Sequence, residues 1–401
     1  MAGFRITRVR IKNYRSVAAC DVRLGSLTFL VGPNGSGKSN FIDALRLVAD
    51  SLRTSLDHAL RDRGGISEVR RRSTGHPRNF SIRLDFASAN TAGHYAFEIG
   101  SREGGSYAVT KEECRVEYVD METPSCWYRV ERGRVVDSSE KTLPAVSEDR
   151  LLLVALSGNP LYRPIYDGLS EMGFYNLNPD AVRELQSPDA GELLLRDGAN
   201  VASVLGRLEH RFPKAKERIE SYLATVVPGI VSVARVNLGP KETLEFRQNV
   251  QGGGHSWRFS AASMSDGTLR ALGVLVALFQ VPATTDNLPL IAIEEPEVAL
   301  HPAAADVLRD ALLEASETRQ VLASSHSPEL LDSSDIGDDQ IIAVTAEEGT
   351  TRLARPDRAG IAALRDHLYT PGELLRINQL LPDEGESDPE SSQMRLFEGA
   401  S

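Results

Sequence analysis

The stretch GPNGSGKS, Gly32 to Ser39, has the spacing G-x-x-x-x-G-K-[ST] and decides the fold class of this 401-residue chain. It follows a continuous apolar run, Ser26 to Val31, of the kind expected for a strand buried on both faces. It precedes a segment, Phe41 to Val48, whose apolar residues recur at helical spacing. A glycine-rich turn between such a strand and such a helix points its backbone N–H groups inward, at phosphate oxygens.

The residue types in this loop predict a site for a nucleoside triphosphate and Mg²⁺. Lys38 reaches the terminal phosphates, Ser39 ligates Mg²⁺, and the N-terminus of the following helix adds the positive end of its dipole. The predicted phosphate-binding residues are Gly32, Pro33, Asn34, Gly35, Ser36, Gly37, Lys38, Ser39 and Asn40.

A second motif, LPLIAIEEPE from Leu288 to Glu297, is an apolar strand pattern that ends in two carboxylates. A carboxylate at the carboxyl edge of a sheet, beside a phosphate loop, can hold hydrated Mg²⁺, and the next one can orient and deprotonate the attacking water. We assign Glu294 to Mg²⁺ and Glu295 to the water. Aspartate is the usual residue on the metal side, so Glu294 departs from the pattern by one methylene.

Two further segments carry candidate phosphate contacts. SMSDGTLRAL places Ser265, Asp266 and Gly267 at a helix N-terminus, where a hydroxyl and unpaired N–H groups form a second anion site. The alternative for this segment is a capped helix with no ligand. VLASSHSPELL places His326 just after a strand, where an imidazole can donate to a γ-phosphate. The alternative is a structural histidine.

The order of these motifs along the chain resembles that of the ABC-type ATPases, in their SMC/RecF-like branch. The sequence is most similar to the OLD-type (overcoming-lysogenization-defect) ATPases of bacterial defence systems. The segments that carry this resemblance are KNYRS (Lys12 to Ser16), GPNGSGKSN, SDGTLR, IEEPEVALHP and SSHSPELL.

The resemblance implies that ATP is held between two heads, so that each head lacks half of its site. One side would carry the phosphate loop with Lys38, and also Glu294 and Glu295, while His326 would sense the γ-phosphate. Ser265 and Gly267 would contact the nucleotide bound by the partner. An ATPase that forms an ATP-dependent homodimer, or a higher oligomer, is therefore expected, with Lys38, Glu295 and His326 as the catalytic group.

The chain departs from the family pattern in two places. It has no glutamine before Gln186, so the role of the usual Q-loop glutamine is vacant or filled by another group. The OLD family usually carries a TOPRIM nuclease, and the 75 residues after His326 (401 minus 326) are too few for one. A separate effector or nuclease from the same operon is the expected partner. The segment LLLRDGANVASVL, Leu193 to Leu205, resembles a recurring segment of these ATPases but has no assigned chemistry.

These patterns predict an α/β fold: an ABC-type ATPase head with a mainly parallel central sheet flanked by helices, an antiparallel β subdomain and an inserted helical lobe. The expected domains are a first lobe over 1–145, a mainly helical insertion over 146–260, a second lobe over 261–381 and an acidic, disordered tail over 382–401. Within the insertion, Leu193 to Leu208 is expected to be a helix.

Composition limits the partners. The net charge of -11 argues against a protein coated all over in nucleic acid, but a local basic groove is compatible with it. The arginine-rich stretch Arg53 to Arg83 is the candidate for nucleic-acid contacts, with a solvated loop as its alternative. No apolar run reaches the roughly 18 residues of a membrane span, and the first residues do not resemble a secretory signal. We therefore expect a cytoplasmic protein that does not associate with membranes.

Three functions remain open at this stage. The first is an ATP-driven switch that controls an effector or engages nucleic acid in anti-phage defence. The second is a RecF-like ATPase of DNA repair or recombination that works without a nuclease partner. The third is a transporter subunit, which is disfavoured because transporters place their signature much closer to the phosphate loop than the separation of Ser39 and Ser265 here.

Overall fold

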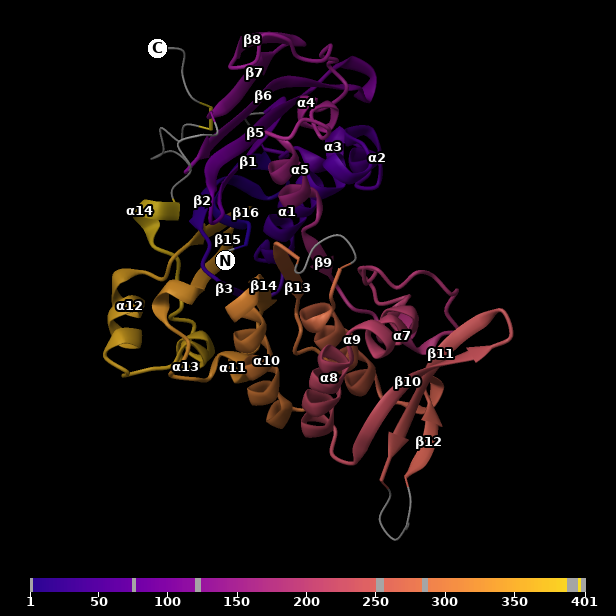
Figure 1. Ribbon diagram of the computed structural model, residues 1–401. Coiled ribbons are helices and arrows are strands. Elements are labelled where there is room, and N and C mark those ends of the chain that lie inside the picture. The colour runs from indigo at the N-terminus through magenta and orange to yellow at the C-terminus, as the bar shows by residue number, and fades with distance from the viewer. Residues whose placement is uncertain are drawn as a thin grey trace. The chain divides into compact units, whose positions relative to one another are not determined.

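The computed structural model describes residues 3–73, 77–119, 124–249, 256–282, 288–387 and 396–397. The chain divides into two compact units, which are described separately (Figure 1). Unit 1 comprises Met1–Met172, Ile336–Tyr369 and Ile377–Ser401, and unit 2 comprises Gly173–Asp335 and Thr370–Arg376. Both units combine strands with helices, so the predicted α/β class is confirmed.

Unit 1 is built on one large mixed sheet. Its strands, in spatial order, are β8 (Arg134–Ser138), β7 (Cys126–Glu131), β6 (Tyr107–Tyr118), β5 (Thr91–Ser101), β4 (Asn79–Ala87), β1 (Arg5–Tyr14), β2 (Val17–Arg23), β16 (Thr350–Ala354), β15 (Ile341–Glu347) and β3 (Leu27–Val31). The strands from β8 to β2 pair antiparallel, whereas β2 with β16 and β15 with β3 pair parallel.

The expected antiparallel strands are present within the first lobe, 1–145, and they continue the sheet of β1. Strand β4 pairs with β1 from Ala87 opposite Arg5 to Ser81 opposite Lys12. Apolar side chains on both strands are fully buried, among them Val9 and Leu84. Burying this shared face joins the two sets of strands into one sheet.

A late segment of the chain supplies two strands beside the phosphate loop. Strand β15 pairs with β3 through Ile341 to Ala343, and β16 joins β2. All five residues of β3 are buried, as expected for a strand with neighbours on both faces. Residues 341–354 thus belong to unit 1, although sequence patterns had grouped them with the second lobe.

The helices of unit 1 are α1 (Lys38–Arg53), α2 (Leu56–Arg61), α3 (Ile66–Val69), α4 (Leu152–Ala155), α5 (Arg163–Ser170), α12 (Arg358–Arg365) and α14 (Glu384–Ser387). Helix α1 is held at its C-terminal end by α5, because Arg53 donates to the Ser170 carbonyl at 2.7 Å and Tyr166 donates to the Leu52 carbonyl at 3.1 Å.

Unit 2 contains three parallel strands and a separate antiparallel sheet. The parallel strands are, in order, β14 (Gln320–Ser325), β13 (Leu290–Glu294) and β9 (Gly173–Tyr175); the second sheet is β10 (Ile230–Leu238), β11 (Lys241–Gln248) and β12 (Trp257–Ser260). Its helices are α6 (Pro179–Arg183), α7 (Val201–Arg211), α8 (Pro213–Val226), α9 (Asp266–Phe279), α10 (Ala305–Thr318), α11 (Pro328–Leu331) and α13 (Pro371–Arg376).

The helix expected over Leu193 to Leu208 is wrong in its first half, because α7 begins only at Val201. Gly198 has a φ of 86°, which a right-handed helix does not allow. The Asn200 side chain accepts a hydrogen bond from Leu195 N at 2.8 Å, and Asp197 accepts one from Ala199 N. These local hydrogen bonds compete with helix formation and shape a loop instead.

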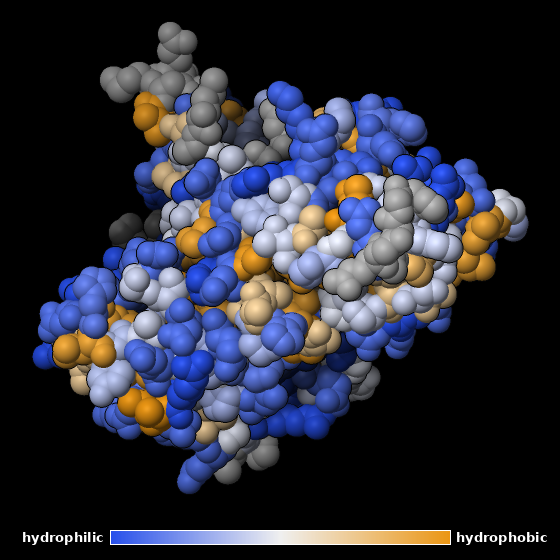
Figure 2. Space-filling view, turned by 90° about the horizontal axis from the view of Figure 1, so that it is seen from below, coloured by the Kyte–Doolittle hydropathy of each residue, from blue (hydrophilic) through white to orange (hydrophobic). Residues whose placement is uncertain are grey.

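Two expectations concern the surface and the C-terminal end. Among the residues with a described placement, no helix is long and apolar enough to cross a membrane. The face shown in Figure 2 is mainly hydrophilic, with apolar residues in small separate groups. In the acidic segment 382–401, Glu384–Ser387 forms α14 and Leu396 is buried, while 388–395 and 398–401 lie outside the described residues.

Candidate nucleotide-binding and catalytic site

The phosphate loop lies between β3 and α1 in unit 1, and two of its glycines are required by close packing. A Cβ on Gly32 would lie 1.9 Å from the Val344 carbonyl oxygen in β15. A Cβ on Gly37 would lie 1.9 Å from Thr351 Oγ1, and Gly37 also has a φ of 103°. Gly35 differs from both: it has a φ of 77°, but a Cβ added to it would meet no atom within 4 Å. The loop therefore packs against the Val344 backbone and the Thr351 side chain, and it is open at Gly35.

Lys38 and the start of α1 turn this loop into a cationic cradle. The Lys38 ammonium donates to the carbonyls of Gly32 at 2.8 Å and Pro33 at 3.0 Å. The N-cap of α1 is Gly37, which provides no side-chain cap. The Ser36 hydroxyl is buried and has no hydrogen-bond partner in the described part of the chain. A curved, positively charged loop of this kind fits the phosphates of a nucleotide.

Other predicted loop residues lie at its rim. Pro33, Asn34, Gly35 and Ser39 are exposed, so the Ser39 hydroxyl is accessible to a metal ion. Asn40 is used differently, because its amide donates to Ser16 Oγ at 2.6 Å. That hydroxyl also hydrogen-bonds Thr351 Oγ1 at 2.6 Å. Asn40 therefore links the loop to the KNYRS segment and to β16.

The carboxylates of the second motif end β13 in unit 2. Glu294 is the last residue of the strand, and Glu295 follows with a φ of 47°, which is uncommon for a residue with a side chain. The Glu295 N–H donates to the Ser324 carbonyl at 3.0 Å, which fixes this turn against β14. His326 Nδ1 lies 3.4 Å from Glu295 Oε1. The structure thus brings together two residues that the sequence had proposed independently.

Two side chains, the buried Arg270 and the partly exposed Glu297, support this strand end, and sequence reasoning missed both. Arg270 of α9 donates to the carbonyls of Glu295 at 2.8 Å, Glu294 at 3.2 Å and Leu177 at 2.6 Å. Glu297 accepts from Ser325 Oγ at 2.6 Å and from His326 N at 3.3 Å.

Burial raises the pKa of the Glu297 carboxyl above its ordinary value, although those hydrogen bonds oppose the shift. Both Arg270 and Glu297 lie inside quoted motifs, SDGTLR and IEEPEVALHP, which was the available signal.

The candidate signature residues begin α9 in unit 2. Ser265 is the N-cap and accepts from Thr268 N at 3.2 Å, as expected for a capping serine. A Cβ on Gly267 would lie 2.5 Å from the Ala299 carbonyl, so glycine is required there. Asp266 is exposed and pairs with Arg183 of α6. Ser265 and Asp266 thus face solvent, and both the capped-helix and the partner-contact interpretations remain compatible with this geometry.

An arginine from the unassigned segment reaches the predicted metal ligand. Arg196 Nη2 donates to Glu294 Oε1 at 2.7 Å. Two residue types suit a phosphate-bound Mg²⁺: unit 1 offers the hydroxyl of Ser39, and unit 2 offers the carboxylate of Glu294. Within the ranges that the structure describes, no group of three or more His, Cys, Asp and Glu side chains could hold a metal by itself. Each unit thus offers one oxygen ligand of the kind that Mg²⁺ takes beside nucleotide phosphates.

The arginines proposed for nucleic-acid contacts mostly bind protein acceptors. Arg63 pairs with Asp43 at 3.0 Å and with Asp50 at 2.8 Å. Arg71 donates to the Ser16 carbonyl and to Thr350 Oγ1, both at 2.7 Å. The Arg63 side chain is 1% exposed and Arg71 already spends donors on the protein, so this stretch is a weaker candidate than its composition suggested.

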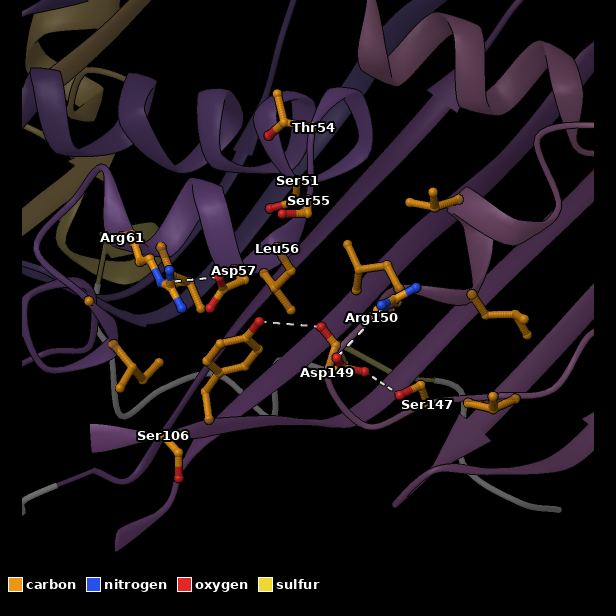
Figure 3. Close-up of a pocket in the computed structure, with 18 of the residues that line it drawn as sticks. Ser51, Thr54, Ser55, Leu56, Asp57, Arg61, Ser106, Ser147, Asp149 and Arg150 are labelled. Atoms are coloured by element: carbon orange, nitrogen blue, oxygen red, sulfur yellow. Dashed lines mark hydrogen bonds and ion pairs between the residues drawn. The ribbon is translucent and has the colours of Figure 1, made fainter. Parts of the chain in front are cut away.

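A cavity of unit 1 lies away from the predicted loop. It has a volume of about 1160 Å³ and is lined by the end of α1, by α2, by the turn before β6 and by residues 145–155 (Figure 3). Its charged groups form two ion pairs, Arg61 with Asp57 and Arg150 with Asp149, so its charge is balanced. None of the residues from Gly32 to Ser39 lines it.

Known proteins that resemble this chain are ATPase domains and SMC heads. A family model described as an AAA ATPase domain matches residues 5–115. A second, described as an AAA domain, putative AbiEii toxin, Type IV TA system, matches residues 161–332. The SMC head bound to the C-winged helix domain of ScpA aligns over 87% of this chain and 97% of its own, with a TM-score of 0.53 and 14% identity.

An Smc head with an extended coiled coil from Pyrococcus furiosus gives a TM-score of 0.51 at 13% identity, over 91% of this chain and 99% of its own. These likenesses show that the fold is that of an SMC ATPase head.

Curated relatives match over shorter segments. The DNA replication and repair protein RecF of Vibrio cholerae is 41% identical over 54 residues, which is 13% of this chain and 15% of that protein. The OLD nuclease of Thermus scotoductus is 41% identical over 51 residues, which is 13% of this chain and 10% of that protein. The chain thus spans only about a seventh of the length of the RecF relatives that it matches. Together with the family models, these matches support an ATPase of the SMC/RecF type.

Proposed function

We propose that this chain binds and hydrolyses ATP, dimerises head to head around it, and uses this switch to control a partner effector or to engage nucleic acid. The observation that carries the proposal is the phosphate loop, in which Gly32 and Gly37 have no room for a side chain and Lys38 closes the loop. This geometry favours a bound triphosphate over a decorative turn.

In this proposal each motif has a defined task. The residues from Gly32 to Asn40 hold the phosphates, and Ser39 and Glu294 hold Mg²⁺, which would offset the charge of the β- and γ-phosphates. Glu295 orients the attacking water and accepts its proton. His326 lies 3.4 Å from Glu295 and donates to the γ-phosphate, so it positions the group that the water attacks.

The proposed dimer follows from the signature at the start of α9. Ser265, Asp266 and Gly267 would bind the triphosphate held by the other copy. The exposure of Ser265 and Asp266 supports this role, because a residue that contacts a partner's ligand has to be accessible in the monomer. Two such half-sites would make dimerisation dependent on ATP.

The variant Glu295→Gln tests this mechanism. It should bind ATP as the parent does, hydrolyse it at least about 100-fold more slowly because the general base is lost, and accumulate as a dimer. Light scattering with and without ATP, together with phosphate release, measures both effects. Lys38→Ala is the matched control, and it should lose nucleotide binding and remain monomeric. Hydrolysis at the parent rate by Glu295→Gln would refute the assignment of the base.

Two observations favour different tasks for the switch. The family description that names a putative toxin, and the match to an OLD nuclease, favour control of an effector in anti-phage defence. The match to RecF favours a RecF-like ATPase of DNA repair or recombination, and is equally strong. Affinity purification from the native host separates these tasks. A small nuclease or toxin partner would support defence, and replication proteins would support repair.

A further inference from the structure

The guanidinium of Arg196 forms an ion pair with the carboxylate of Glu294, the residue that binds Mg²⁺ in the proposed function. Its Nη2 lies 2.7 Å from Glu294 Oε1, while the side chain of Glu294 is 12% exposed and that of Arg196 is 44% exposed. Among the described residues of unit 2, Arg196 is the cation that pairs with this carboxylate. Arg270, the other nearby cation, donates to the Glu294 backbone carbonyl instead.

The loop that carries Arg196 is held rigidly in place. The Arg196 carbonyl accepts from Asn176 N at 2.9 Å, and the Asp197 carbonyl accepts from Asn178 N at 3.0 Å. Leu194 N donates to the buried side chain of Gln280 at 2.8 Å. Because strand β9, which ends at Tyr175, runs parallel to β13, this anchored loop lies at the same carboxyl edge as Glu294.

We propose that Arg196 is a positioning residue that holds Glu294 in the nucleotide-free head and yields Oε1 when Mg²⁺ and ATP bind. This inference rests on the proposed function of Glu294. A guanidinium and a divalent cation compete for the same carboxylate oxygen, so each must weaken the binding of the other. Because the Arg196 side chain is partly exposed, it can move away without breaking the anchored backbone.

The inference also gives chemistry to one unexplained segment of the sequence. The segment LLLRDGANVASVL contains Arg196, and its remaining polar groups build the loop that aims this arginine. The first glutamine of the chain, Gln186, is buried and bonds Ala202 N at 2.9 Å, so its side chain supports the start of α7. Because Arg196 leaves the Glu294 carboxylate when Mg²⁺ binds, it does not replace a Q-loop glutamine, which helps to hold the metal.

The test measures binding of a fluorescent ATP analogue in Glu295→Gln protein, as a function of Mg²⁺ and also with chelator. Arg196→Gln should lower the Mg²⁺ concentration for half-maximal binding by about three- to tenfold, since one charged competitor is removed. Binding in chelator should stay unchanged. Arg196→Lys should retain most of the parent behaviour. The matched control is Arg218→Gln, an exposed arginine of α8 that pairs with Glu314, and it should change neither quantity.

A thermodynamic cycle excludes an indirect effect. The Mg²⁺ half-point is the Mg²⁺ concentration for half-maximal binding of the ATP analogue. In protein that also carries Glu294→Gln, the Arg196→Gln change should no longer shift this half-point. A half-point within twofold of the parent, one that rises, or an equal shift in Arg218→Gln would each overturn the inference. If the parent binds no nucleotide at any Mg²⁺ concentration, the proposed function fails first. Normal nucleotide binding with an unmoved half-point overturns only the role of Arg196.

Discussion

The phosphate loop in unit 1 and the end of β13 in unit 2 are built in opposite ways. The loop is one continuous stretch in which glycines and backbone groups form the surface, and its neighbours Val344 and Thr351 leave no space for a Cβ. At the end of β13, side chains from separate segments meet, with Arg196, Arg270 and His326 arranged around Glu294 and Glu295.

The difference shows how each region responds to substitution. Where neighbouring atoms already fill the space, as at Gly32 and Gly37, the loop cannot accept a Cβ unless it shifts. A cluster of side chains can instead lose one member and retain its shape, as long as the remaining buried groups keep their hydrogen bonds. The following three predictions test this contrast in order of decreasing effect.

The largest effect is expected for Gly32→Ala in the loop. The new Cβ would lie 1.9 Å from the Val344 carbonyl, which belongs to strand β15 and cannot yield. The loop must shift, and nucleotide affinity should fall at least about 100-fold, as for other ångström-scale displacements in binding sites. Gly35→Ala is the control within the loop, since it meets no atom and carries only the strain of its φ, about 1–2 kcal/mol. Equal losses in the two variants, measured by calorimetry, would contradict the distinction.

An intermediate effect is expected for Arg270→Ala beneath the end of β13. Removing the buried guanidinium leaves the carbonyls of Leu177, Glu294 and Glu295 without this donor, at a cost of about 2–4 kcal/mol in unfolding free energy. Denaturant unfolding measures the loss. Arg258→Ala, in an exposed pair with Glu245, should cost less than about 1 kcal/mol. A loss for Arg270→Ala no larger than this control would show that the strand end holds its shape without the arginine.

The smallest effect is expected in how the unfolding free energy depends on pH, to which the two units contribute with opposite signs. In unit 1, burial would raise the pKa of Asp43, but Arg63, Arg15 and Arg46 outweigh it and the pKa is lowered. Asp43 therefore stabilises the fold above about pH 4, and this contribution is lost on acidification through its lowered pKa. In unit 2 the raised pKa of Glu297 has the opposite sign, so stability falls as pH rises above about 4.3 through that pKa.

The variant Glu297→Gln isolates the second contribution. It keeps an oxygen that can accept from Ser325 and His326, but it does not ionise. Its unfolding free energy should equal that of the parent within about 1 kcal/mol at pH 4 and decline less as pH rises to 7.5. Parallel pH profiles for variant and parent would rule out this account of Glu297.

Sequence reasoning succeeded wherever the relevant residues are neighbours in the chain. The strand before Gly32, the helix after it and the capped start of α9 each follow from local spacing. It failed at residues 193–200, where Asp197 and Asn200 replace helical hydrogen bonds with their own. It could not indicate that β15 pairs with β3, because nothing local in residues 341–347 indicates which strand edge they will join.

By itself the amino-acid sequence determined the phosphate loop, because a backbone cradle needs glycines at set spacing within one short segment. It also determined which carboxylates end a buried strand. Only the tertiary structure decided that Arg196 reaches Glu294 and that Arg270 supports the strand end from below. Such pairings depend on the path of the chain across the sheet, where 98 positions separate two side chains that lie 2.7 Å apart.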